Sequence, residues 1–364
     1  MDPAGGEQPP FGTYAAVGLA GGHLLATEAA ARLTRLGAQV ERLEPVARSP
    51  AHWGSWFVAA VRRRAETVGP IPPTIGYLSA GALALAHDDA LAALLSAAPG
   101  EAVVNNRFSC DAFVVSGDPE ATLAALEGCE TDNAAARNLE SGGYRLRDLS
   151  AHPWSRFDVD TPLDLALLRA AAGLPGMRRT SAGVAAFLEM ARLPGDRELA
   201  IPNQERIGTV VRDRGAELLV AGRIPAGLLV WLESETACRV RALVEERGMR
   251  SARGIGRPRS LLARTLERDG AEALVAQLAS LADAVILDTR VLMASLGGSA
   301  DAAAWPPAEE RFASDFGDHR SIGTRWLAQL TEAAAAAAVP FLLGGHSLVS
   351  DGLRIPVAAA WAGH

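Results

Sequence analysis

Lysine is absent from this chain. All 35 basic residues are arginine, in a sequence of 364 residues. A P-loop needs a lysine at the phosphates, a Schiff-base enzyme needs a lysine amine, and a protein kinase needs a strand lysine. The composition therefore excludes all three classes of enzyme.

Cysteine is scarce as well, with residues only at positions 110, 129 and 238. Three cysteines cannot form a full disulfide framework, and none lies in a Cys-x-x-Cys or Cys/His spacing that would indicate a metal site. We therefore expect a reducing, cytoplasmic location. The first residues contain no apolar signal core, and no run of roughly 18 apolar residues occurs, so neither secretion nor a membrane span is expected.

Apolar residues, by contrast, make up 49% of the chain, which is enough for two hydrophobic cores. The formal net charge is −7 and the pI is about 5.6, so a concentrated basic face for nucleic acid is not expected. Acidic residues outnumber arginine in the first half and equal it in the second. Such an asymmetry fits two different domains.

Apolar runs that alternate with helical patterns predict an α/β fold with largely parallel sheets. In the first half we expect strands at 14–20, 40–46, 74–79, 101–105, 111–116 and 156–159. In the second half we expect strands at 217–222, 239–244, 284–288 and 340–343. The pattern predicts two α/β domains, 12–175 and 195–364, with a linker near 173–180 and the second domain the smaller open sheet.

The most specific string is Phe157-Asp158-Val159-Asp160-Thr161-Pro162-Leu163-Asp164-Leu165. If residues 156–159 form a strand, alternation places Asp158 and Asp160 on one face, where two carboxylates can hold Mg²⁺. Thr161 is expected to cap the following helix, with Pro162 at its first position. The alternative is that the two acidic residues merely cap and solvate this helix start.

This string resembles the closing motif of the cofactor-type nucleotidyltransferases, which include molybdenum-cofactor guanylyltransferases and guanylyltransferases acting on phosphoenolpyruvate or 2-phospholactate. The resemblance covers about residues 14–172 and continues, in order, through 78–85, 103–106, 109–114 and 132–143. It implies a nucleotidyltransferase-like, glycosyltransferase-A-like Rossmann-type sandwich. It also implies attack by a small anionic acceptor on the α-phosphate of a nucleotide, with loss of pyrophosphate.

The resemblance implies roles for particular residues. Asp158 and Asp160 would hold Mg²⁺, while Asp111 would contact the base or acceptor or replace a missing metal ligand. The nucleotide-binding segments contain Gly21, Gly22, Ser79 and Asn105. In the family the first strand leads into a glycine-rich loop that is followed by arginine and lysine.

Two departures from the family pattern bear on activity. Gly81 stands where the family has a metal-binding aspartate, and the segment 20–25 lacks the basic pair that grips the triphosphate. Two of the charged features that stabilise phosphoryl transfer, the metal ligand and the basic pair, are therefore weak or missing. The first domain is accordingly either a working nucleotidyltransferase or a degenerate scaffold or ligand sensor.

The second half resembles no family, but charged residues follow its predicted strands. Ligands of open α/β sheets bind beyond the carboxyl ends of the strands. The residues expected there are Arg223, Glu245, Asp288, Arg290 and His346. They predict a site for a small anionic molecule, with His346 as an acid or base. The alternative is that strand ends are polar only because they reach water.

Overall fold

The computed structural model describes residues 12–43, 53–249 and 258–362. It confirms the predicted α/β class. His23–Asp158 form one compact unit, and the residues before and after this segment together form a second, larger one. The boundary thus lies at Asp158 rather than between 173 and 195. The unit built mainly from the second half is the larger one, because residues 14–22 and 159–194 also belong to it.

The first predicted strand is wrong, because residues 14–20 begin a long helix, α1 (Tyr14–Arg35). Its sequence is rich in alanine, the residue with the highest helix propensity, and carries a single β-branched residue in its first turns. The buried positions 14, 17, 21, 25, 28 and 32 recur every three or four residues, which is the helical period. No strand covers 40–43, and the rest of the strand predicted at 40–46 falls outside the described residues.

The smaller unit contains a mixed four-stranded sheet of order β1-β3-β2-β4. Its strands are β1 (Thr74–Leu78), β2 (Glu101–Val104), β3 (Ala112–Ser116) and β4 (Arg145–Asp148). β3 runs antiparallel to β1 and β2, whereas β2 and β4 are parallel. The strand predicted at 156–159 is wrong, since that segment is irregular, and β4 takes the last place in the sheet.

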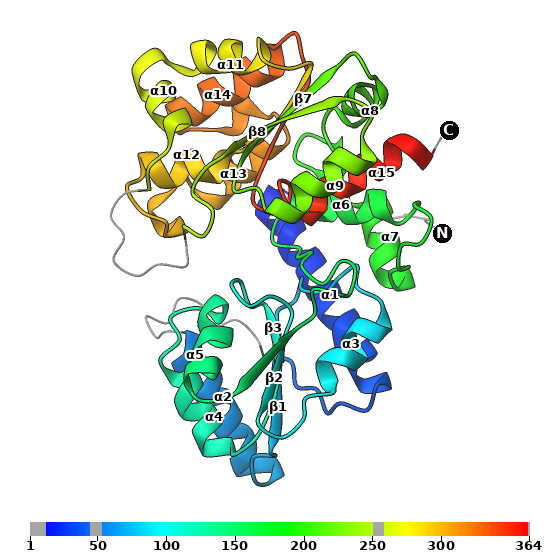
Figure 1. The fold of residues 1–364 in the computed structure, drawn as a ribbon, viewed down its shortest axis with the longest axis vertical. Helices are drawn as coiled ribbons and strands as arrows, with labels where there is room; N and C mark the ends of the chain where they lie inside the picture. The colour runs from blue at the N-terminus through cyan, green and yellow to red at the C-terminus, as the bar shows by residue number, and fades with distance from the viewer. Residues whose placement is uncertain (1–11, 44–52, 250–257, 363–364) are drawn as a thin grey trace, which may run out of the picture. The chain divides into compact units, whose positions relative to one another are not determined.

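Helices cover both faces of this sheet (Figure 1). One face packs against α2 (Trp53–Val68), α4 (Pro119–Glu127) and α5 (Ala135–Ser141), and the other against α3 (Asp88–Leu95). Alternation along β3 sends Phe113 and Val115 into the first core and Ala112 and Val114 into the second. Gly54 allows α2 to approach α4 closely, because a Cβ there would lie 2.1 Å from the Leu126 carbonyl oxygen.

The larger unit contains a wholly parallel four-stranded sheet of order β10-β9-β7-β8. Its strands are β7 (Glu217–Gly222), β8 (Arg239–Val244), β9 (Ala284–Asp288) and β10 (Phe341–Gly344), close to the predicted ranges. β8 lies on one side of β7, and the chain then crosses back to place β9 on the other side. The strand order therefore reverses between β7 and β9.

Helices again cover both faces of the sheet (Figure 1). One core includes α10 (Leu261–Asp269), α11 (Ala271–Ala279), α12 (Thr289–Leu296) and α14 (Arg325–Ala336). The remaining helices are α6 (Pro162–Ala171), α7 (Ala182–Met190), α8 (Gln204–Arg212), α9 (Ala226–Glu235), α13 (Ala308–Asp315) and α15 (Arg354–Ala362). Gly270, with a φ of 87°, ends α10 and separates it from α11.

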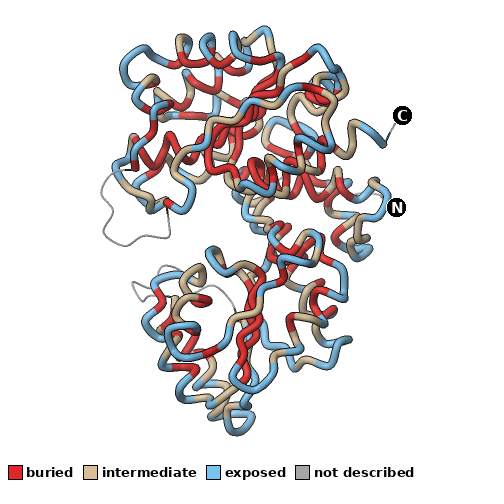
Figure 2. Tube along the Cα trace, viewed as in Figure 1, coloured by how far each residue is buried: buried red, intermediate tan, exposed pale blue. Residues whose placement is uncertain are grey.

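Short elements complete the larger unit. A two-stranded hairpin joins β5 (Arg192–Leu193) to β6 (Arg197–Glu198). Figure 2 shows that β7, β9 and β10 are buried. The edge strand β8 is partly exposed and carries Arg239 and Arg241, whose charges discourage pairing with another chain.

Candidate functional site

Ser79, Asn105 and Asp111 lie together at one edge of the smaller unit's sheet, where β1 and β2 end and β3 begins. The Ser79 amide donates to the Asp111 carbonyl oxygen over 2.9 Å. Asn105, which is 2% exposed, accepts at Oδ1 from the amides of Asp111 and Ala112, each over 3.0 Å. The roles in nucleotide binding and catalysis that the resemblance implies for these three residues stay a prediction. Their hydrogen bonds to one another hold the sheet edge together.

Sequence reasoning missed two acceptors near this edge. The Tyr77 hydroxyl donates to Asp132 over 3.4 Å, and the Ser109 hydroxyl donates to Asn133 over 2.5 Å. Burial and the negative charge of Asp132 raise the pKa of Tyr77, so this phenol stays protonated. The segment 132–143 was part of the resemblance, but only the fold brings it beside the end of β1.

Gly21 and Gly22 lie inside α1 and not in a loop. The phosphate cradle predicted for them needs free amides in a loop, and amides within a helix are used by the helix itself. A Cβ on Gly21 would lie 2.6 Å from Cδ1 of Leu165, whereas a Cβ on Gly22 meets nothing within 4 Å. Gly21 is thus explained by the close packing of α1 on α6.

Asp158 and Asp160 lie in an irregular segment, so strand alternation does not place them on a common face. Asp158 is the last residue of the smaller unit, and Asp160 belongs to the larger one. In the described ranges, no group of three or more His, Cys, Asp or Glu side chains is suited to a metal ion. Mg²⁺ binding by this pair stays a prediction.

The helix start that follows them is as predicted. Thr161 caps α6 by accepting from the Asp164 amide, and Asp164 Oδ2 accepts from the Thr161 amide over 2.9 Å. The Asp160 amide donates to the same oxygen over 3.0 Å. This is a capping box, in which two amide donors at the helix start are satisfied reciprocally. Asp160 therefore contributes to this helix start through its backbone amide.

All five predicted residues lie at the carboxyl edge of the larger unit's parallel sheet, and four of them interact with one another. β7 leads into Arg223, β9 ends at Asp288 before Arg290, and β10 leads into His346. Arg223 Nε donates to Asp288 Oδ2 over 2.6 Å, and Nη2 donates to Oδ1 over 3.0 Å. This ion pair spans the point where the strand order reverses, which is where open α/β sheets bind their ligands.

Asp288 is fully buried and has two further functions in the fold. It caps α12 by accepting from the Arg290 amide over 3.1 Å. Burial raises the pKa of its carboxyl, but Arg223, with His346 and Arg290, outweighs this and holds the pKa below its usual value. Gly222 has a φ of 125°, and a Cβ there would lie 2.3 Å from the Asp288 Cβ. Glycine is therefore required beside this ion pair.

Arg290 forms a second buried ion pair, with Asp315 at the end of α13. Its two terminal nitrogens donate to the two carboxylate oxygens, Nη2 over 2.6 Å. Arg290 Nη1 also donates to Thr289 Oγ1, and that hydroxyl donates to the Gly344 carbonyl oxygen over 3.2 Å. The sequence offered no signal for Asp315, because it lies in a helix that was not predicted.

Asp164 of α6 extends the polar network toward β10. The Ser347 side chain hydrogen-bonds to Asp164, whose charge also acts on Arg290. Burial, together with the negative charge of Asp160, raises the pKa of Asp164 to about 7. Gly345, His346 and Ser347 are partly exposed. They form the solvent side of a network that is otherwise buried.

Glu245 does not join this network, although it directly follows β8. Its carboxylate accepts from the Ser260 hydroxyl over 2.5 Å and from the Leu261 amide over 2.8 Å. It therefore stabilises the start of α10, where an acidic side chain also complements the helix dipole. Glu245 thus lies at the predicted edge, where its amide donates to the Gly222 carbonyl oxygen over 3.0 Å, but its side chain binds the start of α10.

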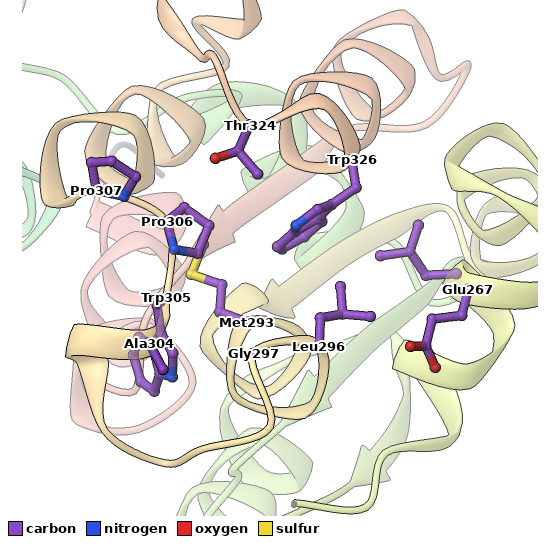
Figure 3. Close-up of a pocket in the computed structure, with 11 residues that line it drawn as sticks. Glu267, Met293, Leu296, Gly297, Ala304, Trp305, Pro306, Pro307, Thr324 and Trp326 are labelled. Atoms are coloured by element: carbon purple, nitrogen blue, oxygen red, sulfur yellow. The ribbon is translucent and has the colours of Figure 1, made fainter.

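An apolar groove of about 570 Å³ lies at the other end of α12 (Figure 3). Met293 and Leu296 of α12 line it together with Gly297, which follows that helix, and with Pro306 and Trp326. It contains none of the predicted site residues. α12 thus begins at the charged edge of the sheet and ends at this groove.

Comparisons with protein-family models, curated proteins and solved structures find no match for this chain. They neither support nor refute the resemblance to nucleotidyltransferases. None of the helices in the described ranges has the length and apolarity needed to cross a bilayer. Function therefore has to be inferred from the residues and geometry of the chain itself.

Proposed function

We propose that the larger unit binds a small anionic molecule at the carboxyl edge of its parallel sheet, between the ends of β7 and β9. The observation that carries this proposal is the position of the Arg223–Asp288 ion pair across the reversal of strand order. In open α/β sheets the crevice at such a point is the usual ligand site. Partly exposed His346 and Ser347 lie at the end of β10 beside it.

The energetics of the two ion pairs support a role in recognition. Asp288 and Asp315 are 0% and 1% exposed, and their arginine partners are 8% and 6% exposed. A buried ion pair is often no more stabilising than well-packed apolar residues of the same volume. Two such pairs at one sheet edge are better explained by preorganisation of guanidinium groups than by a contribution to stability.

Binding can be tested by titrating the full-length protein with small carboxylates and phosphates and following thermal stability and heat of binding. A ligand specific for the folded state, at about 100 times its Kd, adds about 2.7 kcal/mol to the free energy of unfolding. Arg223→Lys keeps the charge but loses the planar fork, so we expect weaker binding. Arg239→Lys, at the opposite end of the sheet, is the matched control. Equal binding by both variants would contradict the proposal.

A second candidate function is nucleotide handling by the smaller unit, with Mg²⁺ and a small anionic acceptor. The clustering of Ser79, Asn105 and Asp111 at one sheet edge favours it. The test is a thermal shift with nucleoside triphosphates in the presence and absence of Mg²⁺. A Mg²⁺-dependent shift that disappears in the Asp158→Ala, Asp160→Ala double variant would support it. Absence of any nucleotide shift would leave this unit as a scaffold.

A further inference from the structure

β1 is an edge strand of the smaller unit's sheet, and its only neighbour there is β3. The Pro73 carbonyl and the Ser79 amide bond to β3. Alternation along an antiparallel strand therefore turns the amides and carbonyls of Thr74, Gly76 and Leu78 away from β3. Within the described ranges these outward groups have no hydrogen-bond partner, and Thr74 and Gly76 are exposed. The outer side of β1 is thus able to pair with another strand.

The absence of charge distinguishes β1 from the other edge strands of the two four-stranded sheets. Its sequence, Thr-Ile-Gly-Tyr-Leu, contains no acidic or basic residue. β4 carries Arg145 and Arg147, β8 carries Arg239 and Arg241, and β10 is buried along its whole length. Charged side chains protect exposed strand edges from other chains. Pairing of β4 or β8 with a second copy of itself brings like charges together, whereas pairing of β1 does not.

We propose that β1 pairs with β1 of a second copy of this chain, in an antiparallel dimer whose two-fold axis passes beside Gly76. Most homo-oligomers are symmetric dimers in which both copies use the same patch. In this register Gly76 lies opposite the partner's Gly76, and Thr74 lies opposite the partner's Leu78. Each outward amide then faces an outward carbonyl of the other copy, as in recognition by strand addition.

The side chains of β1 suit the same register. Ile75 lies opposite the partner's Tyr77, which makes an aromatic and β-branched cross-strand pair on each side of the axis. Ile75 and Tyr77 are only partly buried in the single chain, so the pairing covers further apolar surface. Gly76 leaves the axis without a side chain. The pairing joins the two four-stranded sheets into one continuous sheet and does not depend on the ligand proposed for the larger unit.

The experiment measures self-association of the full-length protein by sedimentation velocity, at concentrations from about 1 to about 200 µM. Thr74→Pro removes an amide that points away from β3, and an edge strand tolerates proline at such a position. We expect this variant to weaken the dimer about tenfold or more. Thr74→Ala is the matched control, because it loses the same hydrogen bond to Ser116 but keeps the amide. A monomer at every concentration, or a dimer that both variants weaken equally or not at all, would overturn the proposal.

Hydrogen exchange of the unmodified protein gives a second readout that does not depend on the folding of a variant. In the monomer the amides of Gly76 and Leu78 face solvent, whereas those of Ile75 and Tyr77 bond to β3. We expect exchange at Gly76 and Leu78 to slow about tenfold or more as the dimer forms, with little change at the other two. Unchanged exchange at Gly76 and Leu78 in a dimeric sample would place the interface elsewhere and contradict the proposal.

Discussion

Arg223 holds Asp288 by two hydrogen bonds, 2.6 and 3.0 Å long, across the reversal of strand order in the larger unit. Three functions meet in Asp288: it neutralises Arg223, caps α12 and packs against Gly222. A substitution of Asp288 therefore affects the ion pair, the cap of α12 and the contact with Gly222 together. The pair thus links the local structure of two strand ends to the site proposed for a ligand.

The first prediction concerns this pair. Asp288→Asn keeps the cap of α12 but leaves the Arg223 charge buried without its partner. Removing one member of a buried ion pair costs about 3–5 kcal/mol of the free energy of unfolding, whereas replacing both by apolar residues costs much less. Arg223→Met combined with Asp288→Leu should therefore unfold at a higher urea concentration than Asp288→Asn. If the double variant is less stable than Asp288→Asn, the prediction is wrong.

The second prediction concerns the Arg290–Asp315 pair. Asp315→Asn should lower the free energy of unfolding by about 3–5 kcal/mol, because the Arg290 charge stays buried. Glu217→Gln breaks the more exposed contacts with Arg239 and Arg241, each 3.3 Å long, and should cost less than about 1 kcal/mol. Urea denaturation of the two variants tests the difference. Similar losses in the free energy of unfolding would show that burial does not determine how much these ion pairs contribute to stability.

The third prediction concerns the pH dependence of stability. Burial and Asp160 raise the pKa of Asp164 from 3.8 to about 7, so the folded state binds its proton more tightly than the unfolded chain does. This stabilisation is complete below about pH 4 and is lost as the pH rises to 7, a change of about 4 kcal/mol at about 1.4 kcal/mol per pKa unit.

Asp164→Asn cannot titrate, so the free energy of unfolding of the wild type, minus that of the variant, should fall between pH 4 and 7. Urea denaturation at several pH values measures this difference. Glu272→Gln serves as the control for loss of one negative charge. A difference that rises with pH would mean that the hydrogen bonds to Asp164 outweigh its burial.

The fourth prediction distinguishes a helix from a phosphate-binding loop at Gly21 and Gly22. Gly22→Ala has free space and should raise the free energy of unfolding by up to about 1 kcal/mol, because alanine favours a helix. Gly21→Ala brings a Cβ to within 2.6 Å of Leu165, and the resulting overpacking should make it about 1–3 kcal/mol less stable than Gly22→Ala. Thermal unfolding of both variants measures the difference. Destabilisation by Gly22→Ala would indicate a backbone that needs glycine.

Local patterns explain which parts of the fold were predictable. Short apolar runs bounded by glycine, proline or charge identified β7, β8, β9 and β10 within a residue or two. The capping box of Thr161 and Asp164 was also readable, because its chemistry involves neighbours in sequence. The segment 14–35 forms a helix and not a strand because its alanine content and helical spacing outweigh an apolar run that ends in two glycines.

Sequence alone determined that the chain is an α/β protein without lysine chemistry, and that Arg223, Asp288, Arg290 and His346 follow strands. Only the tertiary structure decided which of these charges meet. Asp315 reaches Arg290 from 25 positions away in the chain, and Glu245 turns to the start of α10. The physical reason is that strand order and helix packing set these distances, and neither is encoded in the spacing of the residues themselves.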